Sequence, residues 1–198
     1  MLEQRIQQQF FESADLHYQA AESLSRPIVD AVQAMVTGLT NGGRVIAAGA
    51  GPAAALAQLF TADLIGRFER ERPGLAALAL GGDGVVWSAL AGDEGLDAVL
   101  ARQVHALGVP GDVLLLIEQS TGQPALVAAA RAAQAKDMTV VALTGRDGGE
   151  LRNVLSETDV WVAVPHERRA RVLETQLLVL HSLCDAIDLQ LLGEQDPL

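Results

Sequence analysis

Short apolar runs alternate with helix-sized segments through most of the chain. The runs contain no alternating polar positions, which is typical of strands buried on both faces of a parallel sheet. The pattern predicts five strands, near residues 45–48, 76–80, 113–117, 139–143 and 160–164. Connecting helices are expected near residues 53–67, 96–107, 124–135 and 149–155. We therefore expect an α/β fold with a doubly wound, five-stranded parallel sheet flanked by helices, of the flavodoxin-like kind.

Two helices are expected before the first strand. In a glutamine-rich segment, apolar side chains recur every fourth residue and so share one helix face: Leu2, Ile6, Phe10 and Ala14. A second helix is expected to begin near Pro27, because proline suits the first helical turn. It is expected to end at the glycines that follow Asn41.

The last helix, near residues 169–192, carries apolar side chains around nearly its whole circumference. Such a helix is buried on several sides, either in the core of one chain or between subunits. The apolar content is 49%; with the 19 glycines counted and the one tyrosine left out it is about 58%, above the ~45 to 50% typical of that count, which favours burial in an oligomer interface. No repeat or linker divides the chain, so we expect one domain over residues 1–198. Its parts are a helical segment (1–43), an α/β core (44–168) and the last helix (169–193).

Charge and composition exclude several classes of function. The net charge is −11 and Lys136 is the only lysine, so nucleic acid is not expected as a direct ligand. Cys184 is the only cysteine, which rules out an internal disulfide and fits a reducing cytoplasm. The amino terminus does not resemble a secretory signal. The longest apolar run, residues 45–57, is too short to span a membrane. We expect a soluble, cytoplasmic protein.

Three glycine-containing turns follow predicted strands, where open parallel sheets bind ligands. The first, residues 49–54, has the form G-x-G-x-x-A, but no acidic residue ends the second strand, so a nicotinamide or flavin cofactor is not expected. The second covers residues 118–123 and the third covers residues 144–149. The three turns predict a ligand site at this edge of the sheet.

These turns, with four further segments in the same order, resemble the SIS (sugar isomerase) domain family. The further segments are residues 67–73 (RFERERP), 111–115 (GDVLL), 142–149 (ALTGRDGG) and 164–165 (VP). The resemblance covers essentially the whole chain. It implies a homotetramer with a five-stranded parallel sheet, and it is strongest to two branches, the phosphoheptose isomerases and the initiator-associating proteins of the DiaA type.

The isomerase branch implies a set of site residues. Ligand-binding positions of the family fall at Gly49, Gly51, Ala53, Ser120, Thr121, Gly122 and Glu174. The general base falls at Asp63, one methylene shorter than the glutamate of the family, and the acid falls at His181. Alternatively, His181 pairs with Asp185 and Asp63 faces solvent or meets Arg67, as purely structural contacts.

Several positions depart from the isomerase pattern. The first loop lacks the hydroxyl and amide side chains of the family. An ungapped comparison puts Glu118 beside the phosphate, whereas a slip of one residue brings Ser120, Thr121 and Gly122 into the loop. Leu59 and Leu173 replace a histidine and a glutamine and have no donor atom, so no zinc and no other metal or cofactor is expected.

The end of the chain resembles the DiaA branch, in which the positions of Leu191 and Leu192 belong to a protein-binding surface. The first interpretation is therefore a non-catalytic tetramer that binds the replication initiator DnaA and promotes its assembly at the origin, with an altered phosphosugar pocket. One alternative is a phosphoheptose isomerase that converts sedoheptulose 7-phosphate to D-glycero-D-manno-heptose 7-phosphate. The other is a sensor that binds a sugar phosphate without turnover.

Overall fold

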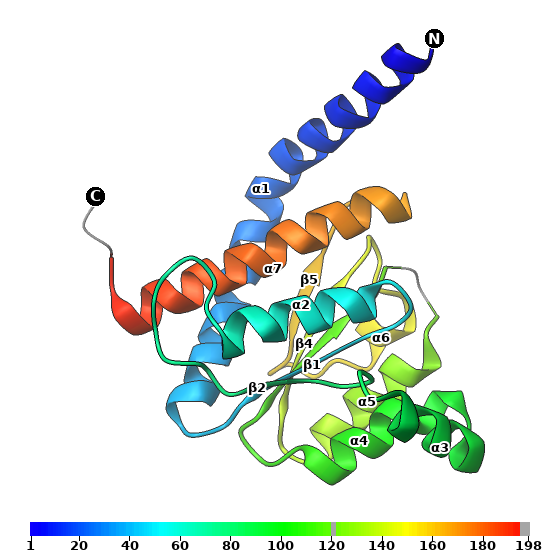
Figure 1. Ribbon diagram of the computed structural model, residues 1–198, viewed down its shortest axis with the longest axis vertical. Coiled ribbons are helices and arrows are strands. Elements are labelled where there is room, and N and C mark those ends of the chain that lie inside the picture. Colours follow the sequence, from blue (N-terminus) through cyan, green and yellow to red (C-terminus); the bar gives the residue numbers. More distant parts are fainter. Residues whose placement is uncertain (120–121, 195–198) are drawn as a thin grey trace.

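A parallel sheet of five strands forms the centre of the fold in the computed structural model, which describes residues 1–119 and 122–194 (Figure 1). The strands are β1 (Val45–Gly49), β2 (Ala77–Ala79), β3 (Val113–Ile117), β4 (Thr139–Thr144) and β5 (Val160–Ala163). Their order is β2-β1-β3-β4-β5, with every pairing parallel. This is the flavodoxin-like order, so the expected fold class is confirmed.

Helices cover both faces of the sheet and complete two apolar cores. On one face lie α1 (Leu2–Thr40), α2 (Ala53–Ile65) and α7 (Arg169–Leu192); on the other lie α4 (Val99–Leu107), α5 (Pro124–Gln134) and α6 (Gly149–Asn153). Strand side chains alternate between the cores: Val45 faces the first, whereas Ile46 faces the second. Both residues are completely buried, which explains the continuous apolar runs.

The segment before β1 is one helix, α1, of 39 residues, so the prediction of two helices was wrong. Pro27 lies inside it. Proline removes one backbone hydrogen bond, but the buried stripe runs unbroken past it, from Leu24 to Ala31 and Met35, and this packing holds the helix together. The amino-terminal half of α1 extends beyond the rest of the molecule (Figure 1).

A helix that the sequence did not predict, α3 (Gly84–Glu94), follows β2. Asp83 caps it by accepting hydrogen bonds from the backbone N–H groups of Val85 and Val86. The expected helix over residues 96–107 is divided into a short 3-10 helix, η1 (Leu96–Ala98), and α4. No side chain of α3 is buried, so it lacks the periodic apolar face that a sequence pattern detects.

The loop between α2 and β2 is fastened to the end of α7. Arg72 and Asp188 are both 1% exposed, and Nε of Arg72 lies 2.5 Å from Oδ1 of Asp188. Arg72 also donates to the backbone carbonyls of Asp63 and Leu64, at 2.9 and 2.8 Å. Arg72 is thus a buried clamp that joins this loop to α2 and α7 within the chain.

None of the helices in the described part of the chain is long and apolar enough to cross a membrane.

Candidate functional site

A cavity of about 450 Å³ opens where β3, β4 and β5 end. Three segments line it: Glu118 and Gln119 after β3, residues 144–148 from the last residue of β4 onward, and His166, Glu167 and Arg169 from the loop after β5 to the first residue of α7. Ligands of open parallel sheets bind at this edge. The cavity includes two of the three glycine-containing turns; the first turn, residues 49–54, does not line it.

Glu118 is the most unusual side chain of the cavity, since it is a carboxylate that is only 2% exposed. Its Oε1 accepts a hydrogen bond from the backbone N–H of Gln123, at 3.1 Å. Burial raises the pKa of Glu118 from its ordinary value of 4.5 to about 7; the bond from Gln123 opposes the shift, whereas Asp147 and Glu150 add to it. At neutral pH the side chain therefore exists in both protonation states.

Two glutamines beside Glu118 retain unused hydrogen-bonding capacity. Gln176 on α7 is completely buried, and its Nε2 donates to the backbone carbonyls of Glu118 and Leu143, at 2.8 and 3.2 Å. This ties α7 to the ends of β3 and β4. Within residues 1–119 and 122–194, neither Nε2 of Gln119 nor Oε1 of Gln176 has a partner. Buried polar atoms without partners are costly, so a ligand or water is expected to satisfy them.

The first glycine turn has a tight backbone. A Cβ on Gly49 would lie 2.4 Å from the backbone of Ala53, and Gly51 has a φ of +57°, so glycine is required at both positions. The N–H groups of Ala53 and Ala54 donate to carbonyls within the turn, and the Ala53 side chain is fully buried. These two amide groups are therefore already hydrogen-bonded within the chain.

The other expected ligand-binding residues are dispersed. Ser120 and Thr121 lie outside the described residues, and Gly122 adopts a φ of +88° beside them. Glu174 accepts hydrogen bonds from Ser13 on α1, at 2.9 Å, and from Arg171, at 2.7 Å. It does not line the 450 Å³ cavity. Within one chain, Glu174 thus joins α7 to α1.

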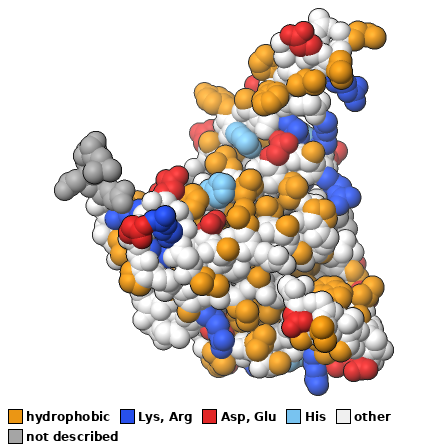
Figure 2. Space-filling model, viewed as in Figure 1, with side chains coloured by type: hydrophobic (Ala, Val, Ile, Leu, Met, Phe, Trp, Pro, Cys, Tyr) orange, Lys and Arg blue, Asp and Glu red, His pale blue; other side chains and the backbone are white. Residues whose placement is uncertain are grey.

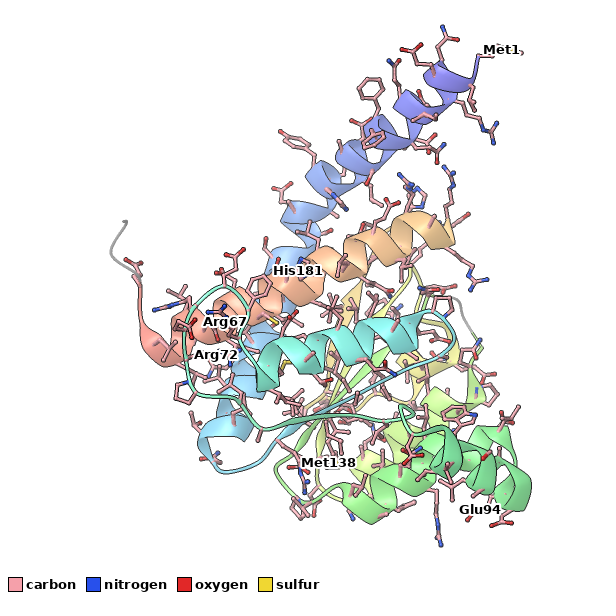
Figure 3. The ribbon with its side chains drawn as sticks, in the orientation of Figure 1. Met1, Arg67, Arg72, Glu94, Met138 and His181 are labelled. Carbon is pink, nitrogen blue, oxygen red and sulfur yellow. The ribbon has the colours of Figure 1, made fainter. Side chains whose placement is uncertain are left out.

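Asp63 and His181 lie on the neighbouring helices α2 and α7. Asp63 is close enough to Cys184, one turn beyond His181, to affect its thiol: burial, then Asp63 and Asp188, raise the pKa of Cys184 to about 12, against the opposing charge of Arg72. The ring of His181 lies 5.3 Å from that of Phe68, centroid to centroid. Figure 3 shows His181 on α7 beside the loop that carries Arg67 and Arg72. The structure thus brings the two expected catalytic side chains to one pair of helices.

Of the purely structural alternatives, neither pairing occurs among the described contacts, whereas half-buried Asp63 remains partly exposed to solvent. No hydrogen bond joins His181 to Asp185 there, and Arg67 pairs with Glu71 rather than with Asp63. Phe68 and Arg72 are the neighbours that sequence reasoning missed. The only signal for them was the family-like segment at residues 67–73.

Asp63 and the glycine turn lie at opposite ends of α2. Ten residues separate Ala53 from Asp63, which corresponds to about 15 Å along the helix axis. Within one chain, a sugar phosphate held by its phosphate at the edge of the sheet therefore reaches Asp63 only in an extended conformation along α2.

A zinc ion does not fit the residues present. Leu59, 41% exposed, and Leu173 occupy two ligand positions of the isomerase pattern and offer no donor atom. Among the residues that the structure describes, no three His, Cys, Asp or Glu side chains gather in a way that could hold a metal.

Comparisons with known proteins define the family. The SIS domain model matches residues 9–145, and the chain belongs to the SIS domain family. It is 59% identical over 196 residues to a phosphoheptose isomerase of Methylibium petroleiphilum, covering 99% of this chain and 98% of that protein. It is 46% identical over 192 residues to the DnaA initiator-associating protein DiaA of Klebsiella pneumoniae, covering 97% of this chain and 98% of that protein.

A solved structure supports the same relationship. The phosphoheptose isomerase of Neisseria gonorrhoeae superimposes with a TM-score of 0.88 at 41% identity, covering 95% of this chain and 99% of that chain. The family and fold implied by the sequence resemblance are thus confirmed. Most of the similar proteins carry the isomerase name, which reverses the order of the two functions that the sequence suggested.

Proposed function

We propose that the chain is a sugar-phosphate isomerase of the phosphoheptose type, which converts sedoheptulose 7-phosphate to D-glycero-D-manno-heptose 7-phosphate. The observation that carries this proposal is the 59% identity, over nearly the full length of both chains, to a protein named phosphoheptose isomerase. The placement of Asp63 and His181 on adjacent helices supports it. Both side chains are half-buried, so they are accessible to a ligand.

The reaction moves a proton between neighbouring carbons of the ketose. Asp63 removes a proton from C1 while His181 donates a proton to the C2 carbonyl oxygen, giving an enediol. Asp63 then returns its proton to C2, and the hydroxyl proton on C1 passes back to His181, leaving an aldehyde. Atoms and charges balance, and no redox partner is needed. The bond from Arg72 to the carbonyl of Asp63 holds the end of α2 in place.

We further propose that the chain forms a homotetramer, as its resemblance to the SIS domain family implies. Apolar side chains at the projecting end of α1 support assembly: Leu2, Ile6, Phe10, Phe11 and Tyr18 are each more than half exposed. Figure 2 shows apolar side chains gathered on this projection.

Turnover of sedoheptulose 7-phosphate tests the proposal, measured by NMR as product formation and as exchange of the C1 proton in D₂O. His181→Ala and Asp63→Asn are each expected to reduce kcat by about 10²- to 10⁴-fold. Asp185→Asn, an exposed change one turn beyond His181, is the matched control and retains activity. A flat progress curve for folded, oligomeric wild-type protein refutes isomerisation.

A second candidate function is a docking scaffold for DnaA, as in the DiaA branch. A specific observation favours it: Leu192, at the end of α7, is 43% exposed next to half-buried Leu191. Exposed apolar groups with a polar rim are typical of binding surfaces. A tetramer displays four copies of this surface and gains avidity without chemistry.

Calorimetric titration with the amino-terminal domain of DnaA from the same organism tests the scaffold. Leu191→Ala with Leu192→Ala is expected to weaken binding, whereas Leu178→Ala, at an exposed position earlier on α7, serves as the control. Absence of binding at high micromolar concentration refutes the scaffold. If sugar phosphates raise the melting temperature but no turnover follows, the sensor is supported instead.

A further inference from the structure

We propose that the cavity at the ends of β3 and β4 accepts the phosphate group only when Glu118 is protonated, so that Glu118 donates a hydrogen bond to the ligand and binding takes up one proton. The inference rests on the proposed function, because it assumes that the ligand is a sugar phosphate. It assigns Glu118 as a binding residue and makes affinity depend on pH.

The position of the carboxylate is the first observation. Glu118 follows β3 directly, lines the cavity and is almost completely buried. Its Oε1 accepts the N–H of Gln123, the residue that caps the amino end of α5. When charged, the carboxylate of Glu118 therefore occupies the anion site at the amino end of α5. A phosphate dianion next to a buried carboxylate is strongly repelled, so the carboxylate must first be neutralised.

An unused donor in the same cavity is the second observation. Gln119 is 8% exposed and lines the cavity, and its Nε2 has no partner among the described residues. An amide N–H donates to a phosphate oxygen but gains nothing from a cation. With Glu118 protonated, the cavity thus offers two adjacent donors, one from each side chain. This arrangement suits an anion.

The charged groups around Glu118 explain why it titrates near neutrality. Those that face the cavity or act on Glu118 are Arg146, Asp147, Glu150, His166, Glu167 and Arg169. Arg146 pairs with Glu167, so its charge is compensated. Of these groups, α7 contributes Arg169, its first residue, and it places the uncharged Gln176 beside Glu118, whereas the first turn, residues 49–53, is apolar. Burial and the acids Asp147 and Glu150 hold the pKa of Glu118 at about 7.

Binding then follows a simple proton balance. One proton from solvent joins Oε2 of Glu118, and the resulting O–H donates to a phosphate oxygen while Oε1 retains the bond from Gln123. The apparent affinity scales with the protonated fraction of Glu118. For a pKa of about 7, the affinity falls about tenfold between pH 8 and pH 9. The phosphate group itself does not titrate in this range, because its second pKa is about 6.

Isothermal titration calorimetry of the full-length protein with sedoheptulose 7-phosphate tests this inference. Measurements between pH 7.5 and 9, in buffers of different ionisation enthalpy, give the number of protons taken up. Wild-type protein is expected to take up nearly one proton per ligand at pH 8 and to lose about tenfold in affinity per pH unit. Glu118→Gln keeps the shape and a permanent donor, so it is expected to bind without proton uptake and with constant affinity.

Glu157→Gln is the matched control, because Glu157 is an exposed carboxylate that does not line the cavity. It is expected to keep the proton uptake of wild type. The inference is overturned if wild type binds without proton uptake, or if Glu118→Gln has the same pH dependence as wild type. It is also overturned if only Glu118→Gln binds, even at pH 6.5, since Glu118 then excludes the phosphate.

Failure of the proposed function has a different signature. Turnover with affinity independent of pH refutes the role of Glu118 alone. If neither protein binds sugar phosphate and neither has turnover, sugar-phosphate chemistry is refuted and the role of Glu118 with it.

Discussion

Replacing Glu118 by glutamine is expected to stabilise the folded protein at alkaline pH, and much less at acidic pH. The pKa of Glu118 is about 7 in the folded protein, above its ordinary value of 4.5, so the folded state holds the proton more tightly than the unfolded state. Below pH 4.5 both states are protonated. As the pH rises from 4.5 to 7, the unfolded state ionises first and the folded protein loses stability.

The size of this effect follows from the two pKa values. The difference between pKa values of 4.5 and about 7 corresponds to a loss of about 3 kcal/mol in the free energy of unfolding. Between pH 5.5 and pH 8, a range that avoids the isoelectric point near 4.7, the wild-type protein is expected to lose about 2 kcal/mol relative to Glu118→Gln. Glutamine does not titrate, so the difference between the two proteins isolates Glu118 from every other ionisable group.

Urea unfolding followed by circular dichroism measures this difference. Both proteins are unfolded at several pH values between 5.5 and 8, at one fixed protein concentration, because assembly contributes to apparent stability. Glu157→Gln, a change at an exposed carboxylate away from the cavity, is expected to show no such trend relative to wild type. If the difference between wild type and Glu118→Gln stays constant over this pH range, the folded protein does not penalise the charge of Glu118 and the reasoning fails.

Three further outcomes are expected. Asp188→Ala leaves the buried charge of Arg72 unpaired and is expected to lower the free energy of unfolding by about 3 to 5 kcal/mol in urea titrations. The apolar double variant Arg72→Met, Asp188→Leu is expected to lose less stability. A loss below about 1 kcal/mol for Asp188→Ala contradicts the clamp. The buried thiol of Cys184, with a pKa of about 12, is expected to react with a thiol reagent at pH 8 only after unfolding, and rapid reaction of native protein contradicts its burial. Deleting residues 1–13 is expected to reduce the number of chains per assembly, measured by sedimentation equilibrium. An unchanged number of chains excludes the projecting helix from assembly.

Strands were the most predictable elements, because a central strand buried on both faces consists of consecutive apolar residues. The predicted third strand, residues 113–117, matches β3 (Val113–Ile117) at both ends. At the edge of the sheet, β2 (Ala77–Ala79) is shorter than predicted, since only one neighbour, β1, pairs with it. Helices that depend on tertiary packing were predicted less well. Pro27 suggested a break that the packing of α1 overrides.

The candidate site was only partly predictable. Gly49 and Gly51 were recognisable because a tight turn before a helix needs glycine, and the structure requires glycine at both. The backbone carbonyl of Glu118 accepts a hydrogen bond from Gln176 on α7, 58 residues further along the chain, and no local pattern predicts this contact. The pairing of Arg72 with Asp188 joins residues 116 positions apart, and no local pattern encodes it. In sequence, Arg72 belongs to an alternating charged run of the kind that usually faces solvent.

The start of α1 projects away from the rest of the chain, so whether its first turns stay helical depends on contacts with another surface. Residues 2–8 are all exposed, and isolated helices shorter than about 12 to 15 residues are marginal in water. In dilute solution, the first turns are therefore expected to fray, with rapid amide hydrogen exchange. Once another surface covers Ile6 and Phe10, exchange is expected to slow. The first turns of α1 thus act as an internal reporter of assembly, readable residue by residue.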